Sequence, residues 1–153
     1  MKFETADYGT LTLRLALGGM FLSHGLLKLF VFTLPGTAAF FASVGFPAFT
    51  AYIVVPAEIL AGIALLVGFQ VRFVALAGLP ILIGTVVVHA GNGWLFSSPK
   101  GGWEYPLYLI VTSLALAFLG GGRIAVTRPK TQSIDETGRT SQHDPITAPT
   151  FSH

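Results

Sequence analysis

The chain has 153 residues, room for one domain, and 52% of them are hydrophobic while only 10% are charged. This composition and a mean hydropathy of +0.70 exclude an ordinary soluble protein, in which about a quarter of the residues are charged. A net charge of +2 argues against nucleic-acid binding, and the lack of cysteine excludes disulfides, thiolate metal sites, covalent c-type haem and dithiol redox chemistry. Any redox role must therefore use a bound cofactor or a partner protein.

The first predicted element is a membrane-spanning helix over residues 8–32. Its apolar length is sufficient to cross about 30 Å of hydrocarbon, and it exceeds the apolar region of a signal peptide. Leu34-Pro35-Gly36 ends this helix. The aromatic, uncharged segment that continues to Pro47 predicts a loop that lies at the membrane interface or dips into it.

Three further spanning helices are predicted downstream, over residues 51–69, 73–90 and 104–120. Pro80, in the middle of the helix predicted over residues 73–90, predicts a kink there. After the fourth helix the composition becomes polar, which predicts a disordered tail over residues 127–153. The predicted fold is therefore all-α, an integral membrane four-helix bundle over residues 1–126 with a disordered C-terminal tail.

Basic residues near the helix ends predict the orientation of the bundle in the membrane. Lys2 precedes the first helix, Arg72 follows the second, and a basic cluster follows the fourth, formed by Arg123, Arg128 and Lys130. On the other side, the loop before the fourth helix carries only Lys100, although the first helix ends with Lys28. Both termini are therefore predicted to be cytoplasmic, N-in and C-in.

Ionisable residues at membrane depth are costly, so each needs an interior position, a partner or a route to the interface. The predicted helices carry six of them: Arg14, His24, Lys28, Glu58, His89 and Glu104. Alternating helix directions bring five of these, all but Arg14, to the same leaflet. We expect one connected polar pocket there, lined by His24, Lys28, Glu58, His89 and Glu104. We also expect Glu58 to pair with a base of the first helix, Lys28 or Arg14, and depth favours Lys28.

Each of these residues also has a purely structural interpretation. Glu58 and its basic partner could be an ion pair that only fixes helix packing, and His24 a packing histidine. Lys28 could extend its ammonium group to the interface, and His89 and Glu104 could be ordinary interfacial residues. Gly18, Gly25 and the Ala61-Gly62 pair are interpreted as points of close helix approach.

Several short motifs resemble the DoxX family of small bacterial four-helix membrane proteins, which includes relatives of a thiosulfate:quinone oxidoreductase subunit. The resemblance covers residues 8–126. The residues that carry it are Arg14-Leu15-Ala16-Leu17-Gly18, His24-Gly25-Leu26-Leu27-Lys28-Leu29, Pro56-Ala57-Glu58-Ile59-Leu60-Ala61-Gly62 and Gly102-Trp103-Glu104-Tyr105-Pro106. It implies a multi-pass protein of the bacterial inner membrane close to quinone or respiratory chemistry.

The leading hypothesis is a redox-associated membrane subunit whose pocket binds a quinone-type head group. The residues assigned to proton exchange and charge stabilisation are His24, Lys28 and Glu58. The residues assigned to ligand binding are Arg14, His89, Trp94, Glu104 and Tyr105. No metal site is predicted, and a b-type haem held by His24 and His89 is the alternative cofactor.

Two other functions stay open: a non-enzymatic scaffold that holds a soluble redox partner at the membrane, and a small-solute or proton pathway. The expected partners are the lipid bilayer, a protein of a membrane redox complex and further copies of the chain. Whether the chain is an enzyme by itself is left open by the sequence.

Overall fold

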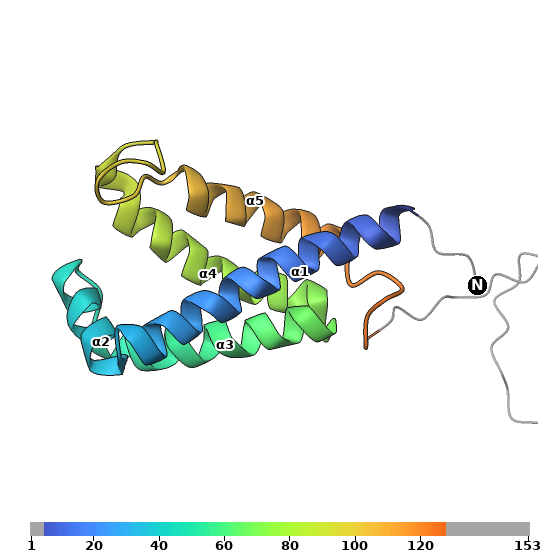
Figure 1. Cartoon of the computed structure of the whole chain (residues 1–153), viewed down its shortest axis with the longest axis horizontal. Coiled ribbons are helices and arrows are strands. Elements are labelled where there is room, and N and C mark those ends of the chain that lie inside the picture. The colour runs from blue at the N-terminus through green and yellow to red at the C-terminus, as the bar shows by residue number, and fades with distance from the viewer. Residues whose placement is uncertain (1–4, 128–153) are drawn as a thin grey trace, which may run out of the picture.

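The computed structural model describes residues 5–127, and over that range the chain is all-helical, as the sequence predicts (Figure 1). The α-helices are α1 (Thr5–Leu26), α2 (Leu34–Ser43), α3 (Ala51–Val67), α4 (Val71–His89) and α5 (Glu104–Leu119). A π-helical turn, Leu27–Val31, extends α1, and two 3-10 turns, Ala48–Thr50 and Ala90–Asn92, precede α3 and follow α4. The predicted disordered tail, apart from Thr127, lies outside the described residues.

Three helical stretches are long and apolar enough to cross a membrane: Thr5–Val31, Ala48–Val67 and Val71–Asn92. The fourth expected span, α5, is apolar as well but has only 16 residues. At 1.5 Å per residue it reaches about 24 Å. It packs against α4 and completes the four-helix bundle.

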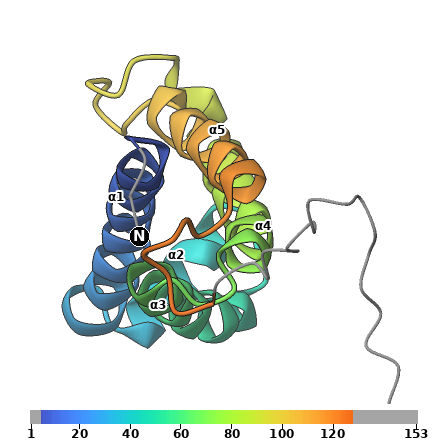
Figure 2. The ribbon, with the colours of Figure 1, turned by 90° about the vertical axis from the view of Figure 1, so that its right-hand side faces the viewer.

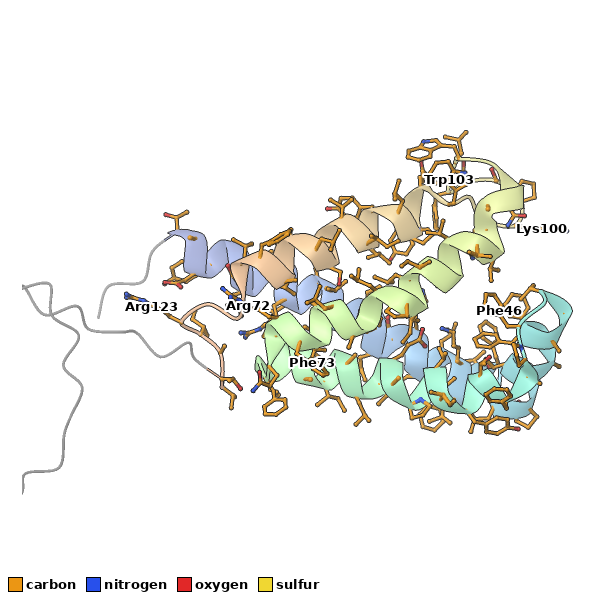
Figure 3. All side chains as sticks on the ribbon, turned by 180° about the vertical axis from the view of Figure 1, so that it is seen from behind. Phe46, Arg72, Phe73, Lys100, Trp103 and Arg123 are labelled. Carbon is orange, nitrogen blue, oxygen red and sulfur yellow. The ribbon has the colours of Figure 1, made fainter. Side chains whose placement is uncertain are left out.

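The four long helices form two pairs, α1 with α3 and α4 with α5. In Figure 1 the pairs meet near the N-terminus of α1 and diverge toward the opposite end, and Figure 2 shows them along the bundle. We call the first end the terminal end and the second, which holds α2 and residues 90–103, the loop end. Arg72 and Arg123 lie at the terminal end, and Lys100 and Trp103 lie at the loop end (Figure 3).

Glycines bring α1 and α3 into backbone contact, as the sequence predicts. A Cβ atom added to Gly62 would lie 2.6 Å from the backbone nitrogen of Leu22, and one added to Gly25 would lie 2.7 Å from Cγ1 of Ile59. Small residues at a helix crossing allow this close approach, which is the main source of helix association in lipid. Between α4 and α5, the buried hydroxyl of Ser113 donates a hydrogen bond to the carbonyl of Ala75 at 2.7 Å.

Helix α2 corrects one prediction, because the segment expected to be an interfacial loop is helical from Leu34 to Ser43. Pro35 lies in the first turn, where its missing N–H removes no intrahelical hydrogen bond, and it initiates a helix after ending the previous one. Thr33 caps this helix by accepting a hydrogen bond from the backbone nitrogen of Gly36 at 3.3 Å. In Figure 1, α2 crosses the loop end at a steep angle to α1 and α3.

Residues 120–127 fold back across the terminal end of the bundle, as the orange segment of Figure 2 shows. Val126 N donates a hydrogen bond to Val67 O at 3.3 Å, and Thr127 N donates one to Gly68 O at 3.1 Å. Arg123 N donates to Oδ1 of Asp7 at 3.1 Å. This segment therefore fastens the end of α5 to α1 and α3.

Candidate functional site

An ion pair joins α1 to α3 toward the loop end of the bundle. Nζ of Lys28 donates to Oε1 of Glu58 at 2.5 Å, and Glu58 is only 3% exposed. The Lys28 side chain retains 20% exposure. The prediction that Glu58 faces the interior and pairs with Lys28 is therefore confirmed.

Lys28 lies in the π-helical turn, a feature that the sequence did not indicate. The turn spans Leu27–Val31, and the nitrogen of Phe32 donates to the carbonyl of Leu27 at 3.0 Å, five residues back. The hydroxyl of Thr37, from α2, donates to the carbonyl of Lys28 at 3.3 Å. Isolated π-helical turns frequently occur at functional sites, because they change the direction of one side chain within an otherwise regular helix.

The second carboxylate oxygen of Glu58, Oε2, has no hydrogen-bond donor within residues 5–127, unlike an oxygen of a fully hydrogen-bonded ion pair. This oxygen is also buried. A buried acceptor left without a donor costs about 1–3 kcal/mol. The ammonium of Lys28 has three hydrogens, of which Glu58 takes one. The pair therefore contains an unused, buried acceptor next to unused donors.

Arg14 is in a different part of the molecule. Its Nη1 donates to the carbonyl oxygen of Gly121 at 3.0 Å, and the residue is 3% exposed. A Cβ atom on Gly68, which caps the C-terminus of α3, would lie 2.5 Å from the same nitrogen. The C-termini of α3 and α5 meet here, and both carry partial negative charge that a cation stabilises. Arg14 thus contributes to the closure of the terminal end and does not contact Glu58.

The two helix histidines have separate environments. His24 is exposed on α1, and its Nδ1 lies 3.0 Å from the carbonyl oxygen of Met20. His89 is the last residue of α4 and stabilises the loop that follows. Its Nδ1 lies 3.0 Å from the carbonyl oxygen of Gly101 and 3.2 Å from that of Lys100. A carbonyl oxygen can only accept a hydrogen bond, so Nδ1 of each ring carries the hydrogen. In a neutral imidazole the other nitrogen, Nε2, then has no hydrogen.

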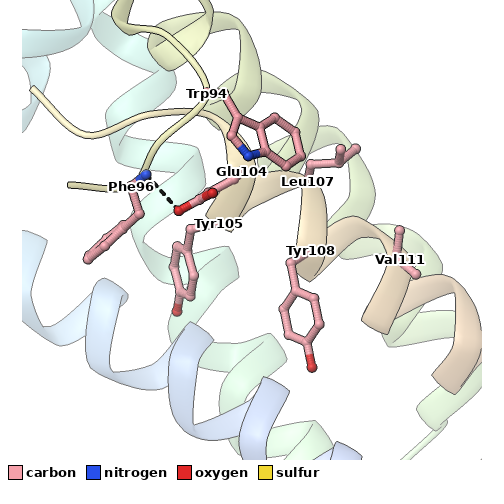
Figure 4. A pocket seen from close by; sticks show the side chains of 7 residues that line it. All are labelled: Trp94, Phe96, Glu104, Tyr105, Leu107, Tyr108 and Val111. Atoms are coloured by element: carbon pink, nitrogen blue, oxygen red, sulfur yellow. Dashed lines mark hydrogen bonds between the residues drawn. The ribbon is translucent and has the colours of Figure 1, made fainter. Parts of the chain in front are cut away.

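A cavity with a volume of about 670 Å³ lies along the loop end of α5 (Figure 4). Its lining residues are Trp94, Phe96, Glu104, Tyr105, Leu107, Tyr108 and Val111. Three of them, Trp94, Glu104 and Tyr105, are residues for which the sequence predicts ligand binding, whereas Phe96 and Tyr108 were not among the predicted residues. The spacing of Tyr105 and Tyr108, three residues apart on one face of a helix, was an available signal.

The structure therefore divides the predicted site residues into groups. Of the five residues expected to share one pocket, only Glu104 lines this cavity. Lys28 and Glu58 form a separate ion pair, and His89 supports the loop from the end of α4. The divergence of the two helix pairs explains this separation, because it moves α1 and α3 away from α4 and α5 at the depth where the ionisable residues occur (Figure 1).

Comparison with known proteins gives two consistent matches. Residues 9–91 match the sequence profile of the DoxX family. A protein of Bacillus subtilis, named "Putative oxidoreductase CatD", is 32% identical over 123 residues, which are 80% of this chain and 87% of that protein. No solved structure matches the chain significantly. The family match includes Lys28 and Glu58 and ends before the residues that line the α5 cavity.

Proposed function

The chain belongs to the DoxX family, and from this premise we propose that it is a redox-associated membrane protein that binds a quinone-type head group at the Lys28–Glu58 pair. The observation that carries the proposal is the buried Oε2 of Glu58, which accepts no hydrogen bond within residues 5–127. Next to it, Lys28 keeps free donors and partial exposure. An oxygen of a bound ring fits this arrangement, since a carbonyl form accepts from Lys28 and a hydroxyl form also donates to Glu58.

A quinone supplies two-electron, two-proton chemistry when it is bound. Lys28 would stabilise negative charge on the ring oxygen by donating a hydrogen bond to it. Glu58 would hold the proton that is exchanged at Oε2. His24 lies one helical turn before Lys28, and its free Nε2 suits proton exchange with the loop end. The electrons would come from a separate electron-donor protein, because the chain has neither cysteine nor a dinucleotide motif.

We place the protein in the bacterial inner membrane with the terminal end in the cytoplasm. Arg72 and Arg123 lie at that end (Figure 3), and basic residues near helix ends remain on the cytoplasmic side. In this orientation the Lys28–Glu58 pair lies in the outer half of the membrane. The proton exchanged at Glu58 would then be taken from or released to the outside.

The test is a titration of the purified protein in nanodiscs with decylubiquinone. We expect saturable binding to the wild type and at least about tenfold weaker binding to Glu58→Gln and Lys28→Met, equivalent to about 1.4 kcal/mol. Asp7→Asn is the matched control, because it makes the same carboxylate-to-amide change at the terminal end. Circular dichroism verifies that each variant is folded. Binding by folded Glu58→Gln and Lys28→Met that equals wild-type binding would refute the proposed site.

A further inference from the structure

The cavity along α5 combines a carboxylate with aromatic side chains from two segments. Glu104 is the first residue of α5, and its Oε1 accepts a hydrogen bond from the backbone nitrogen of Phe96 at 2.7 Å. Within residues 5–127 this carboxylate forms no ion pair. The aromatic members of the lining are Trp94, Phe96, Tyr105 and Tyr108. The negative charge of the cavity is thus left without a cation from the described part of the chain.

The rings are arranged around this carboxylate by a loop with its own hydrogen bonds. Glu104 N donates to Trp94 O at 3.1 Å, and Trp103 N donates to Gly93 O at 3.2 Å, which closes residues 93–104 onto themselves. Trp94 is further fixed by an edge-on contact with Trp103, with ring centroids 4.5 Å apart at 84°. In Figure 4, Trp94 and Phe96 lie on either side of Glu104. The site is therefore preformed by main-chain hydrogen bonds.

Tyr105 and Tyr108 extend the aromatic surface along α5. In Figure 4 they project from the same face of the helix, below the carboxylate. The ring centroids of Tyr105 and Phe96 are 5.7 Å apart, and the ring planes are tilted by 57° relative to each other. The lining also contains two aliphatic residues, Leu107, which lies beside Trp94 in Figure 4, and Val111, which lies farther along α5. The cavity thus combines a carboxylate and aromatic rings with aliphatic side chains.

From this composition we propose that the α5 cavity binds a lipophilic organic cation, with a quaternary ammonium or phosphonium centre and apolar substituents. The faces of aromatic rings attract a cation that lies within about 6 Å of their centroids, and Trp is the strongest of them. Glu104 adds a full negative charge, which a neutral ligand would leave uncompensated. The aliphatic side chains and ring edges of the lining accommodate the apolar substituents, and a volume of about 670 Å³ suits a molecule of this size.

This site is separate from the Lys28–Glu58 pair in residues and in chemistry. At the first site Lys28 offers a cation to the proposed ligand, whereas no basic side chain of the described residues lines the α5 cavity. We therefore expect a positively charged ligand to bind the α5 cavity rather than the Lys28–Glu58 pair. A substitution that removes one site should leave the other intact. The proposal does not depend on the proposed quinone binding.

The test is equilibrium dialysis of the protein in nanodiscs of neutral lipid against labelled tetraphenylphosphonium. Tetraphenylborate, which has the same shape and the opposite charge, is the matched competitor. We expect saturable binding of the cation, one per chain, with no competition by the anion. Glu104→Gln should weaken the binding of tetraphenylphosphonium at least about tenfold. Tyr108→Leu should weaken it severalfold, because it removes one of the aromatic rings that line the cavity.

One control variant keeps the result interpretable. Phe118→Leu removes an exposed aromatic ring from the other end of α5, outside the cavity, and should bind tetraphenylphosphonium like the wild type. If Glu104→Gln fails to fold, Tyr108→Leu alone decides the outcome. Equal binding of the cation and the anion would overturn the proposal, since it would indicate an apolar groove filled by any hydrophobic molecule. Wild-type affinity in folded Tyr108→Leu would overturn it as well.

Discussion

Arg14 and Gly121 are 107 residues apart in the chain, yet Nη1 of the buried arginine donates to the glycine carbonyl at 3.0 Å. This single contact joins the middle of α1 to the segment that follows α5. Because the arginine forms no ion pair within residues 5–127, the carbonyl and the C-termini of α3 and α5 are its electrostatic partners. Arg14 is therefore a structural cation of the terminal end.

Replacement of Arg14 by methionine should lower the stability of the bundle. The substitution keeps the apolar stem but removes a charged hydrogen bond, so we expect the free energy of unfolding to fall by about 1.5–3 kcal/mol. Thermal unfolding in detergent, followed by circular dichroism, measures the change. Arg123→Met is the control, since that side chain is 52% exposed and its pair with Asp7 should contribute less than about 1 kcal/mol. Equal effects of the two substitutions would contradict this role of Arg14.

Gly62 should be sensitive to any added side chain, because Leu22 of α1 occupies the space next to it. A Cβ atom would lie 2.6 Å from the Leu22 nitrogen, so Gly62→Ala must push α1 and α3 apart. We expect a loss of about 1–3 kcal/mol in the free energy of unfolding. Gly19→Ala, a position on α1 with no atom within 4 Å of an added Cβ, should be neutral or slightly stabilising. A stable Gly62→Ala variant would show that the crossing is looser than the structure indicates.

The Lys28–Glu58 pair should show strong non-additivity. Lys28→Met leaves the buried Glu58 carboxylate without its partner, which typically destabilises a protein by about 3–5 kcal/mol. Glu58→Gln leaves the partly exposed Lys28 ammonium without its partner, which should cost less. The double variant removes both charges and should regain part of this stability. A double-mutant cycle by thermal unfolding gives the coupling free energy, expected to be about 1–3 kcal/mol. Additive effects would mean that solvent or lipid headgroups screen the pair.

The proposed orientation can be tested with one engineered thiol. The chain contains no cysteine, so Ser97→Cys introduces a single labelling site in the exposed loop between α4 and α5. A membrane-impermeant maleimide should label it on intact cells. Labelling that requires permeabilised cells would reverse the orientation and place the Lys28–Glu58 pair in the cytoplasmic half of the membrane.

The extent of the long helices and the Lys28–Glu58 pair were predictable from the sequence for the same physical reason. Apolar length defines a span, and a carboxylate at membrane depth must find the base that lies at its own level. Helix α2 was not predicted, because Pro35 both ends one helix and fits the first turn of the next. The α5 cavity was only partly predicted, since the contact of Phe96 with Tyr105 depends on a loop conformation that no periodicity describes.

The position of Arg14 was the least accessible to sequence reasoning. On a helical stripe it aligns with Lys28, so both bases were candidates for Glu58. Its actual partner, Gly121, is a backbone carbonyl beyond the last helix, and no side-chain pattern marks such an acceptor. The return of residues 120–127 across the terminal end creates this contact.

The shortness of α5 affects the membrane around it. Its 16 residues reach about 24 Å, about 6 Å less than a typical hydrocarbon core, while α1 with its π-helical turn and α4 are long enough to cross it fully. A hydrophobic stretch that is too short on one side of a protein is accommodated by local thinning of the bilayer or by snorkelling of the flanking residues. We therefore expect lipid headgroups beside α5 to lie closer to the level of Glu104 than they would beside a helix of full length.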